Sequence, residues 1–133
     1  MKTAIQILLV LPATLMAPVG WYFVLFGYIP EARYGGSASI YFTKAAIFIL
    51  ASGIELVALW NSIFLTGATR AARANRAMVF GLIVSLVFNA FFLVGLIFSP
   101  HRTDLPVVIA GTWILGGPFV VGIWNLMGIC KRQ

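Results

Sequence analysis

Long apolar runs, bounded by charged and turn-forming residues, dominate the pattern along the chain. Three stretches, over residues 3–30, 77–100 and 105–130, contain no Asp, Glu, Lys or Arg, except Arg102 and Asp104 between the last two, and a fourth, over residues 45–69, contains a single acid, Glu55. Each stretch is long enough to cross the hydrocarbon core of a bilayer, because a membrane-spanning helix needs about 20 apolar residues. The pattern predicts transmembrane helices at roughly residues 4–28, 45–66, 77–98 and 107–129.

The connections between these helices are short. Residues 29–39 and 99–106 are dense in proline, glycine and ionisable side chains, which are typical of turns. Because short connections make successive helices antiparallel, the sequence predicts an all-α integral membrane protein of four transmembrane helices in two antiparallel hairpins. The spans and loops use nearly all of residues 1–133, so we expect a single transmembrane domain.

Composition supports this fold class. Hydrophobic residues make up 62% of the chain and charged residues only 9%, whereas ordinary soluble domains carry about 25% charged residues. This excludes a water-soluble globule. The first apolar stretch contains Pro12 and Pro18 and is longer than the apolar segment of a secretory signal, so we expect it to be retained as a helix.

The basic residues predict the orientation, because Lys and Arg near helix ends favour the cytoplasmic side. The N-terminus, the second loop and the C-terminus carry most of them, namely Lys2, Arg70, Arg73, Arg76, Lys131 and Arg132, against Arg33, Lys44 and Arg102 in the other loops. We expect both termini in the cytoplasm and, as the default for so compact a chain, a bacterial inner (plasma) membrane. Topology then explains the net charge of +6, and we expect the lipid bilayer, not a nucleic acid, as the partner.

The second predicted helix carries the one feature with chemical content. At about 100° per residue, one face of this helix presents Lys44, Ala51, Glu55, Ser62 and Thr66. A carboxylate near mid-membrane usually faces the bundle interior or a wet cavity and has a partner. Glu55 is therefore either a proton or cation carrier or a neutral structural acid hydrogen-bonded to Asn89, Asn61, Thr112 or Ser85. The candidate residues for polar coupling are Glu55, Ser62, Thr66, Asn89 and Asn125.

Small residues recur in the other predicted helices. They are expected to let helices approach closely, as small residues do in membrane proteins: Ala13, Ala17, Gly81, Ser85, Gly111, Gly117 and Gly122. Residues 56–61 and 120–125 are also similar in sequence, and each segment ends in Trp-Asn. If this similarity reflects a true repeat, Asn61 and Asn125 lie at equivalent depths.

The chemistry that the sequence lacks narrows the function. The chain has one histidine, His101, and one cysteine, Cys130, which excludes a pair of axial histidines for haem and an internal disulfide. We find no phosphate-binding glycine loop, no metal-ligand cluster, no serine elbow and no paired carboxylates. We therefore expect no catalytic residues, no metal and no cofactor, and a protein that is not an enzyme.

Two functions remain open. The first is an accessory or interaction subunit that docks onto a larger membrane complex through its glycine and alanine ridges, and this is the one the sequence favours by a small margin. The second is an oligomeric proton- or cation-coupled transporter or channel subunit that uses Glu55. Both imply another membrane protein or further copies of the chain as partner.

Overall fold

The computed structural model describes residues 1–33, 38–64 and 72–131. Its long helices are α1 (Lys2–Arg33), α2 (Ala38–Phe64), α3 (Ala72–Ile97) and α4 (Leu105–Cys130), and a short 3-10 helix, η1 (Pro100–Thr103), precedes α4. Each of the four long helices contains a span that is long and apolar enough to cross a membrane. The prediction of an all-helical fold with four such helices is confirmed.

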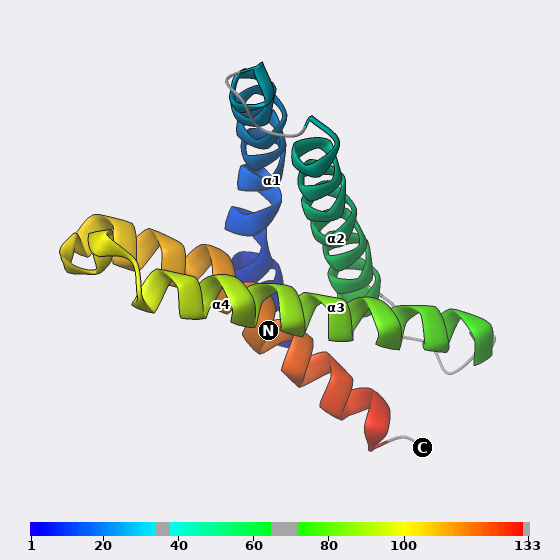
Figure 1. Ribbon diagram of the computed structural model, residues 1–133. Coiled ribbons are helices and arrows are strands. Elements are labelled where there is room, and N and C mark those ends of the chain that lie inside the picture. The colour runs from blue at the N-terminus through cyan, green and yellow to red at the C-terminus, as the bar shows by residue number, and fades with distance from the viewer. Residues whose placement is uncertain (34–37, 65–71, 132–133) are drawn as a thin grey trace.

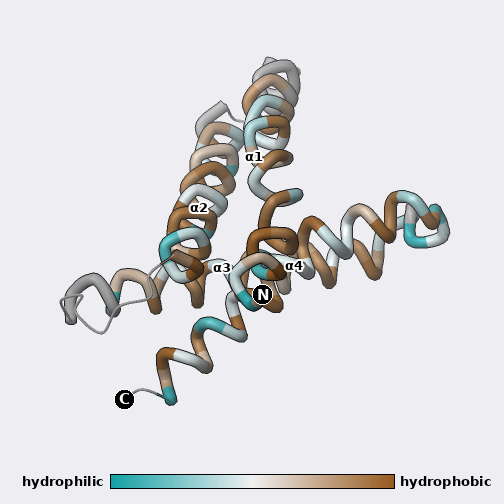
Figure 2. Tube along the Cα trace, turned by 180° about the vertical axis from the view of Figure 1, so that it is seen from behind, coloured by the Kyte–Doolittle hydropathy of each residue, from teal (hydrophilic) through white to brown (hydrophobic). Residues whose placement is uncertain are grey.

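The helices form two antiparallel hairpins, α1 with α2 and α3 with α4 (Figure 1). Around the bundle, α1 packs against α2 and α4, and α3 packs against the same two helices, whereas the described backbones of α1 and α3 do not approach each other closely. The hairpins are joined where the N-terminus lies, and their far ends diverge, as the view from behind also shows (Figure 2).

The helices extend beyond the apolar spans that predict them. Helix α1 continues through Pro30 to Arg33, α2 begins at Ala38, and α3 begins at Ala72. The loop expected at residues 29–39 is thus partly helical. An apolar run marks only the part of a helix suited to a bilayer core, and alanine, lysine and arginine favour helix beyond it.

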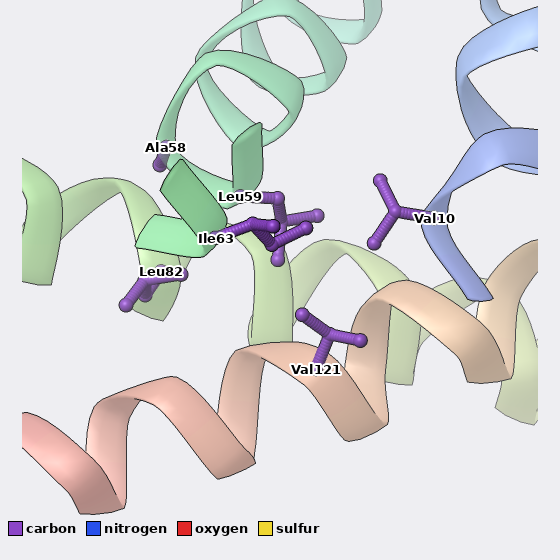
Figure 3. Packing of buried hydrophobic residues seen from close by; sticks show 6 residues of the cluster. All are labelled: Val10, Ala58, Leu59, Ile63, Leu82 and Val121. Carbon is purple, nitrogen blue, oxygen red and sulfur yellow. The ribbon is translucent and has the colours of Figure 1, made fainter. Parts of the chain in front are cut away.

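A small apolar core lies where the two hairpins meet. Its buried residues are Val10, Ala58, Leu59, Ile63, Leu82 and Val121. Figure 3 shows Val10 of α1 and Val121 of α4 pointing toward Leu59 and Ile63 of α2. The core therefore draws on all four helices and joins one hairpin to the other.

The distribution of polarity differs from that in a soluble protein. The buried polar side chains are about as numerous as the buried apolar ones, and they are Gln6, Ser52, Glu55, Ser85, Asn89 and Asn125. Large apolar side chains cover the outside of every helix, with Phe91 of α3 and Phe23 of α1 among the most exposed. An apolar exterior of this extent suits lipid as the surrounding medium.

Two glycines permit the closest helix contacts. A Cβ at Gly117 of α4 would collide with the backbone carbonyl of Leu9 in α1, and a Cβ at Gly81 of α3 would collide with the Cβ of Ala58 in α2. Of the other predicted packing glycines, Gly111 faces Leu96 and Gly122 faces Leu86, both within the α3–α4 hairpin. These glycines are thus used within the chain itself.

Candidate functional site

Glu55 lies in the middle of α2 and is only 3% exposed. Its carboxyl oxygen Oε1 accepts hydrogen bonds from the side-chain amide of Asn89 and, at 3.4 Å, from the hydroxyl of Ser85. Both donors belong to α3 and are four residues apart, so they share one helix face. The Asn89 amide also donates to the Ser85 carbonyl at 2.7 Å, which holds it in place. We call Glu55, Ser85 and Asn89 the acid cluster.

A cavity of about 210 Å³ lies beside the acid cluster, and all four helices line it. Relative to the apolar core, its lining residues lie toward the diverging ends of the hairpins, at residues 13–21, 48–56, 88–92 and 114–115. The predicted packing residues Ala13 and Ala17 line its α1 side.

Aromatic rings form much of the cavity wall. Phe48 of α2 contacts Phe88 and Phe92 of α3, with ring centroids 5.5 and 5.8 Å apart, and the two α3 rings lie 4.8 Å from each other. Trp21 of α1 completes the set of four rings and donates its indole N–H to the Ser52 hydroxyl at 2.7 Å. These contacts fix the rings across three helices.

A second polar group lies on the other side of the apolar core. The Gln6 amide of α1 donates to Oδ1 of Asn125 in α4, and the Asn125 amide donates to the hydroxyl of Ser62 in α2, each at 2.8 Å. Ser62 in turn donates to the carbonyl of Leu59 at 2.8 Å. We call Gln6, Asn125 and Ser62 the amide cluster. It contains no ionisable group.

The structure thus divides the predicted polar stripe of α2. Glu55 belongs to the acid cluster and Ser62 to the amide cluster, with the fully buried Leu59 between them in α2. Thr66 lies outside the described residues. Among the described residues, no hydrogen bond joins the two clusters.

Of the four partners considered for Glu55, the structure places Asn89 and Ser85 against it, while Asn61 and Thr112 are exposed. Asn61 and Asn125, which end the two similar segments, also differ in environment. Asn125 is buried in the amide cluster and Asn61 is on the outer surface of α2.

Sequence reasoning misses several interhelical contacts. Neither Trp21 nor Trp60 receives a role from the sequence, yet each donates its indole N–H to another helix, Trp21 to the Ser52 hydroxyl and Trp60 to the Thr14 hydroxyl at 2.9 Å. Gln6 is also missed as the partner of Asn125. A signal for Gln6 exists, because it is the only amide side chain in residues 3–30.

Within residues 1–33, 38–64 and 72–131, no group of three or more His, Cys, Asp or Glu side chains could hold a metal ion. Comparison with protein-family models, curated proteins and solved structures found no match.

Proposed function

We propose that this chain is a small, non-enzymatic integral membrane carrier in which Glu55 binds and releases a proton or a cation. One observation carries the proposal: the single acid within the apolar spans is buried beside a cavity that all four helices line. An acid that served only to join two helices would need no cavity. Asn89 and Ser85 both donate to Oε1 of Glu55, and no described residue donates a hydrogen bond to Oε2 of Glu55.

A carrier fits the geometry better than a channel. A channel needs a continuous polar path, and the fully buried Leu59 separates the acid cluster from the amide cluster. The cavity instead lies toward the side on which the two hairpins diverge (Figure 1). A change in the tilt of one hairpin relative to the other is a motion that would expose the cavity to one side or the other.

The proposal includes the orientation of the chain in the membrane and its assembly. With the basic residues of both termini and of the second loop in the cytoplasm, the orientation follows the positive-inside rule, and the cavity occupies the outer half of a bacterial inner membrane. Four helices barely enclose a pathway, so the carrier is expected to work as a homo-oligomer or with another membrane protein.

The test is proton flux in liposomes that contain the purified chain. We expect the wild type to dissipate an imposed proton gradient when potassium or an organic ammonium ion is supplied on the opposite side of the membrane, and Glu55→Gln to match empty liposomes, with both proteins inserted in equal amount. Asn125→Leu, which alters the amide cluster, is the matched control and is expected to retain flux per folded molecule. Equal flux from wild type and Glu55→Gln would rule the carrier out.

A second candidate is the accessory subunit, and a different surface supports it. A groove on the α2–α3 face is lined by Gly53, Val57 and Asn61 among others. A Cβ at Gly53 would meet nothing within 4 Å, and Asn61 presents an exposed amide on a helix proposed to lie in lipid. The groove offers a partner helix close approach and a hydrogen-bonding group.

Purification in mild detergent tests the accessory candidate, and the flux assay on the same preparation separates it from the carrier. An accessory subunit is expected to bring down a stoichiometric partner that Gly53→Leu removes. Gly95→Leu is the matched control, because a Cβ at Gly95 of α3 would also meet nothing within 4 Å and Gly95 lies outside the groove. Retention of the partner by Gly53→Leu would remove this surface as the docking site.

A further inference from the structure

We propose that the cavity beside Glu55 binds a small lipophilic organic cation, an ammonium that carries one aromatic or branched aliphatic group, in exchange for the carboxyl proton. This inference names the substrate class of the same site and therefore rests on the proposed function. The four helices that line the cavity are those of the two hairpins in Figure 1.

The negative charge of an ionised Glu55 has to be balanced inside the cavity. Glu55 is the only ionisable side chain among the residues that line the cavity from α1, α2, α3 and α4. Its described hydrogen bonds come from Asn89 and Ser85, and no other described charged side chain lines the cavity. An isolated carboxylate in an apolar interior is costly, so a proton or a bound cation must neutralise it.

The residues that line the cavity supply few oxygen ligands for a metal ion and many aromatic and apolar contacts for an organic cation. Calcium takes 6–8 oxygen ligands in proteins, whereas the only described oxygen-bearing side chains that line the cavity are those of Glu55, Asn89 and Ser52, and the Ser52 hydroxyl is already bonded to Trp21 and to the Phe48 carbonyl. The rest of the lining is apolar. Aromatic faces attract ammonium groups and are the usual means of recognising quaternary ammonium, and four rings line this cavity.

The cavity volume indicates the scale of the ligand that would fill it. Its volume of about 210 Å³ is below the range of about 300–1,000 Å³ usual for drug-sized ligands. One ring with an ammonium head is therefore the expected scale, the head against the Glu55 carboxylate and the apolar group among the phenylalanines.

The exchange step is balanced. The carboxylic acid O–H of Glu55 breaks, the proton leaves to water, and the carboxylate that remains pairs with the incoming ammonium. No other bond forms or breaks, and no electron is transferred. Each ammonium that binds to a protonated site releases one proton, so binding and proton release have the same stoichiometry at a pH at which the free site is protonated.

The experiment uses the full chain in detergent with benzyltrimethylammonium as probe and neopentylbenzene as its uncharged isostere. Binding is followed by calorimetry, and proton release by an indicator dye in weak buffer. We expect one proton released per benzyltrimethylammonium bound and none with neopentylbenzene. Glu55→Gln is expected to weaken probe binding by about 10-fold or more and to release no proton, and Phe92→Leu to weaken it by about 3- to 10-fold.

The comparison of charged and neutral probes on the wild type keeps the test decisive even if a variant fails to fold. Absent or equal binding of the two probes, or binding without proton release, would overturn the inference. Glu55-dependent proton flux in liposomes without ammonium binding would overturn only the ligand class. Flux that does not depend on Glu55 would overturn the proposed function itself.

Discussion

The acid cluster and the amide cluster are built from similar residues and differ in what surrounds them. Both join α2 to other helices through buried amide and hydroxyl groups. In the amide cluster, Gln6, Asn125 and Ser62 bond to one another and to the backbone. In the acid cluster, Glu55 and Asn89 also line a cavity. The two clusters thus represent two kinds of buried polar contact between helices. The groups of the amide cluster bond only to protein partners, whereas the acid cluster also lines a cavity.

The difference assigns the two clusters different roles. The amide cluster lies against the junction of the hairpins and is well suited to fixing their register, since each group has a protein partner. The acid cluster holds the one buried acid of the apolar spans beside a cavity, which is where we propose that a ligand binds. Substitutions in the amide cluster should therefore change stability, and substitutions in the acid cluster should change exchange.

Glu55→Gln is expected to have the largest effect. The amide keeps an acceptor for Asn89 but cannot lose a proton at any accessible pH, so we expect proton exchange to fall by about 100-fold or more, the loss usual for removal of a proton-transferring group. The stability of the variant in a denaturant titration is expected to stay within about 1 kcal/mol of the wild type. A large loss of stability with exchange preserved would reverse the roles assigned to the two clusters.

Gly117→Ala should act on the junction at which the amide cluster lies. The added methyl meets the Leu9 carbonyl and must push α1 away from α4, so we expect a loss of about 1–3 kcal/mol in the free energy of unfolding. Gly128→Ala in the same helix is the control, because nothing lies within 4 Å of its Cβ, and its effect should stay within about 0.5 kcal/mol. Equal effects from the two substitutions would contradict the packing described for α4.

Asn125→Leu removes the centre of the amide cluster. Gln6 and Ser62 each lose a partner, and we expect a loss of about 1–2 kcal/mol in the free energy of unfolding. Ammonium binding and proton flux per folded molecule should be unchanged. Loss of flux in a folded Asn125→Leu protein would show that the two clusters act together.

Trp21→Phe is expected to have the smallest effect. The ring that lines the cavity is kept while the hydrogen bond to Ser52 is lost, and such interhelical bonds contribute about 0.6 kcal/mol on average in membranes. Thermal unfolding in detergent should detect a small decrease in stability. Probe affinity should change by less than about 3-fold; a larger change would assign the indole N–H itself a part in binding.

Much of the fold follows from the length of the apolar runs. Four spans and their order can be predicted because a helix that satisfies its own backbone hydrogen bonds is the simplest structure for such a run. The ends of the helices are harder to predict from the sequence. Hydropathy does not distinguish a charged helical turn from a loop, and α2 begins at Ala38 although the apolar pattern predicts a span only from residue 45.

The candidate site is predictable only in part. Glu55 stands out because it is the one acid in an apolar run, and the spacing of Ser85 and Asn89 places them on one face of the next helix. Which helix faces which is set by packing, and the sequence pattern alone does not encode it. The pairing of Gln6 with Asn125, the inward position of Trp21 and the cavity itself therefore required the structure.

The most direct test of the central claim is the infrared spectrum of the Glu55 carboxyl in proteoliposomes. As the medium is taken from acidic to alkaline, the wild type should lose a carboxylic acid C=O band reversibly and gain a carboxylate band, and Glu55→Gln should lack this change. The other two acids of the chain, Glu31 and Asp104, are present in both proteins and cancel in the comparison. A Glu55 carboxylic acid band that does not change with pH would mean that Glu55 is a structural acid that does not exchange its proton, and would contradict its role as a proton or cation carrier.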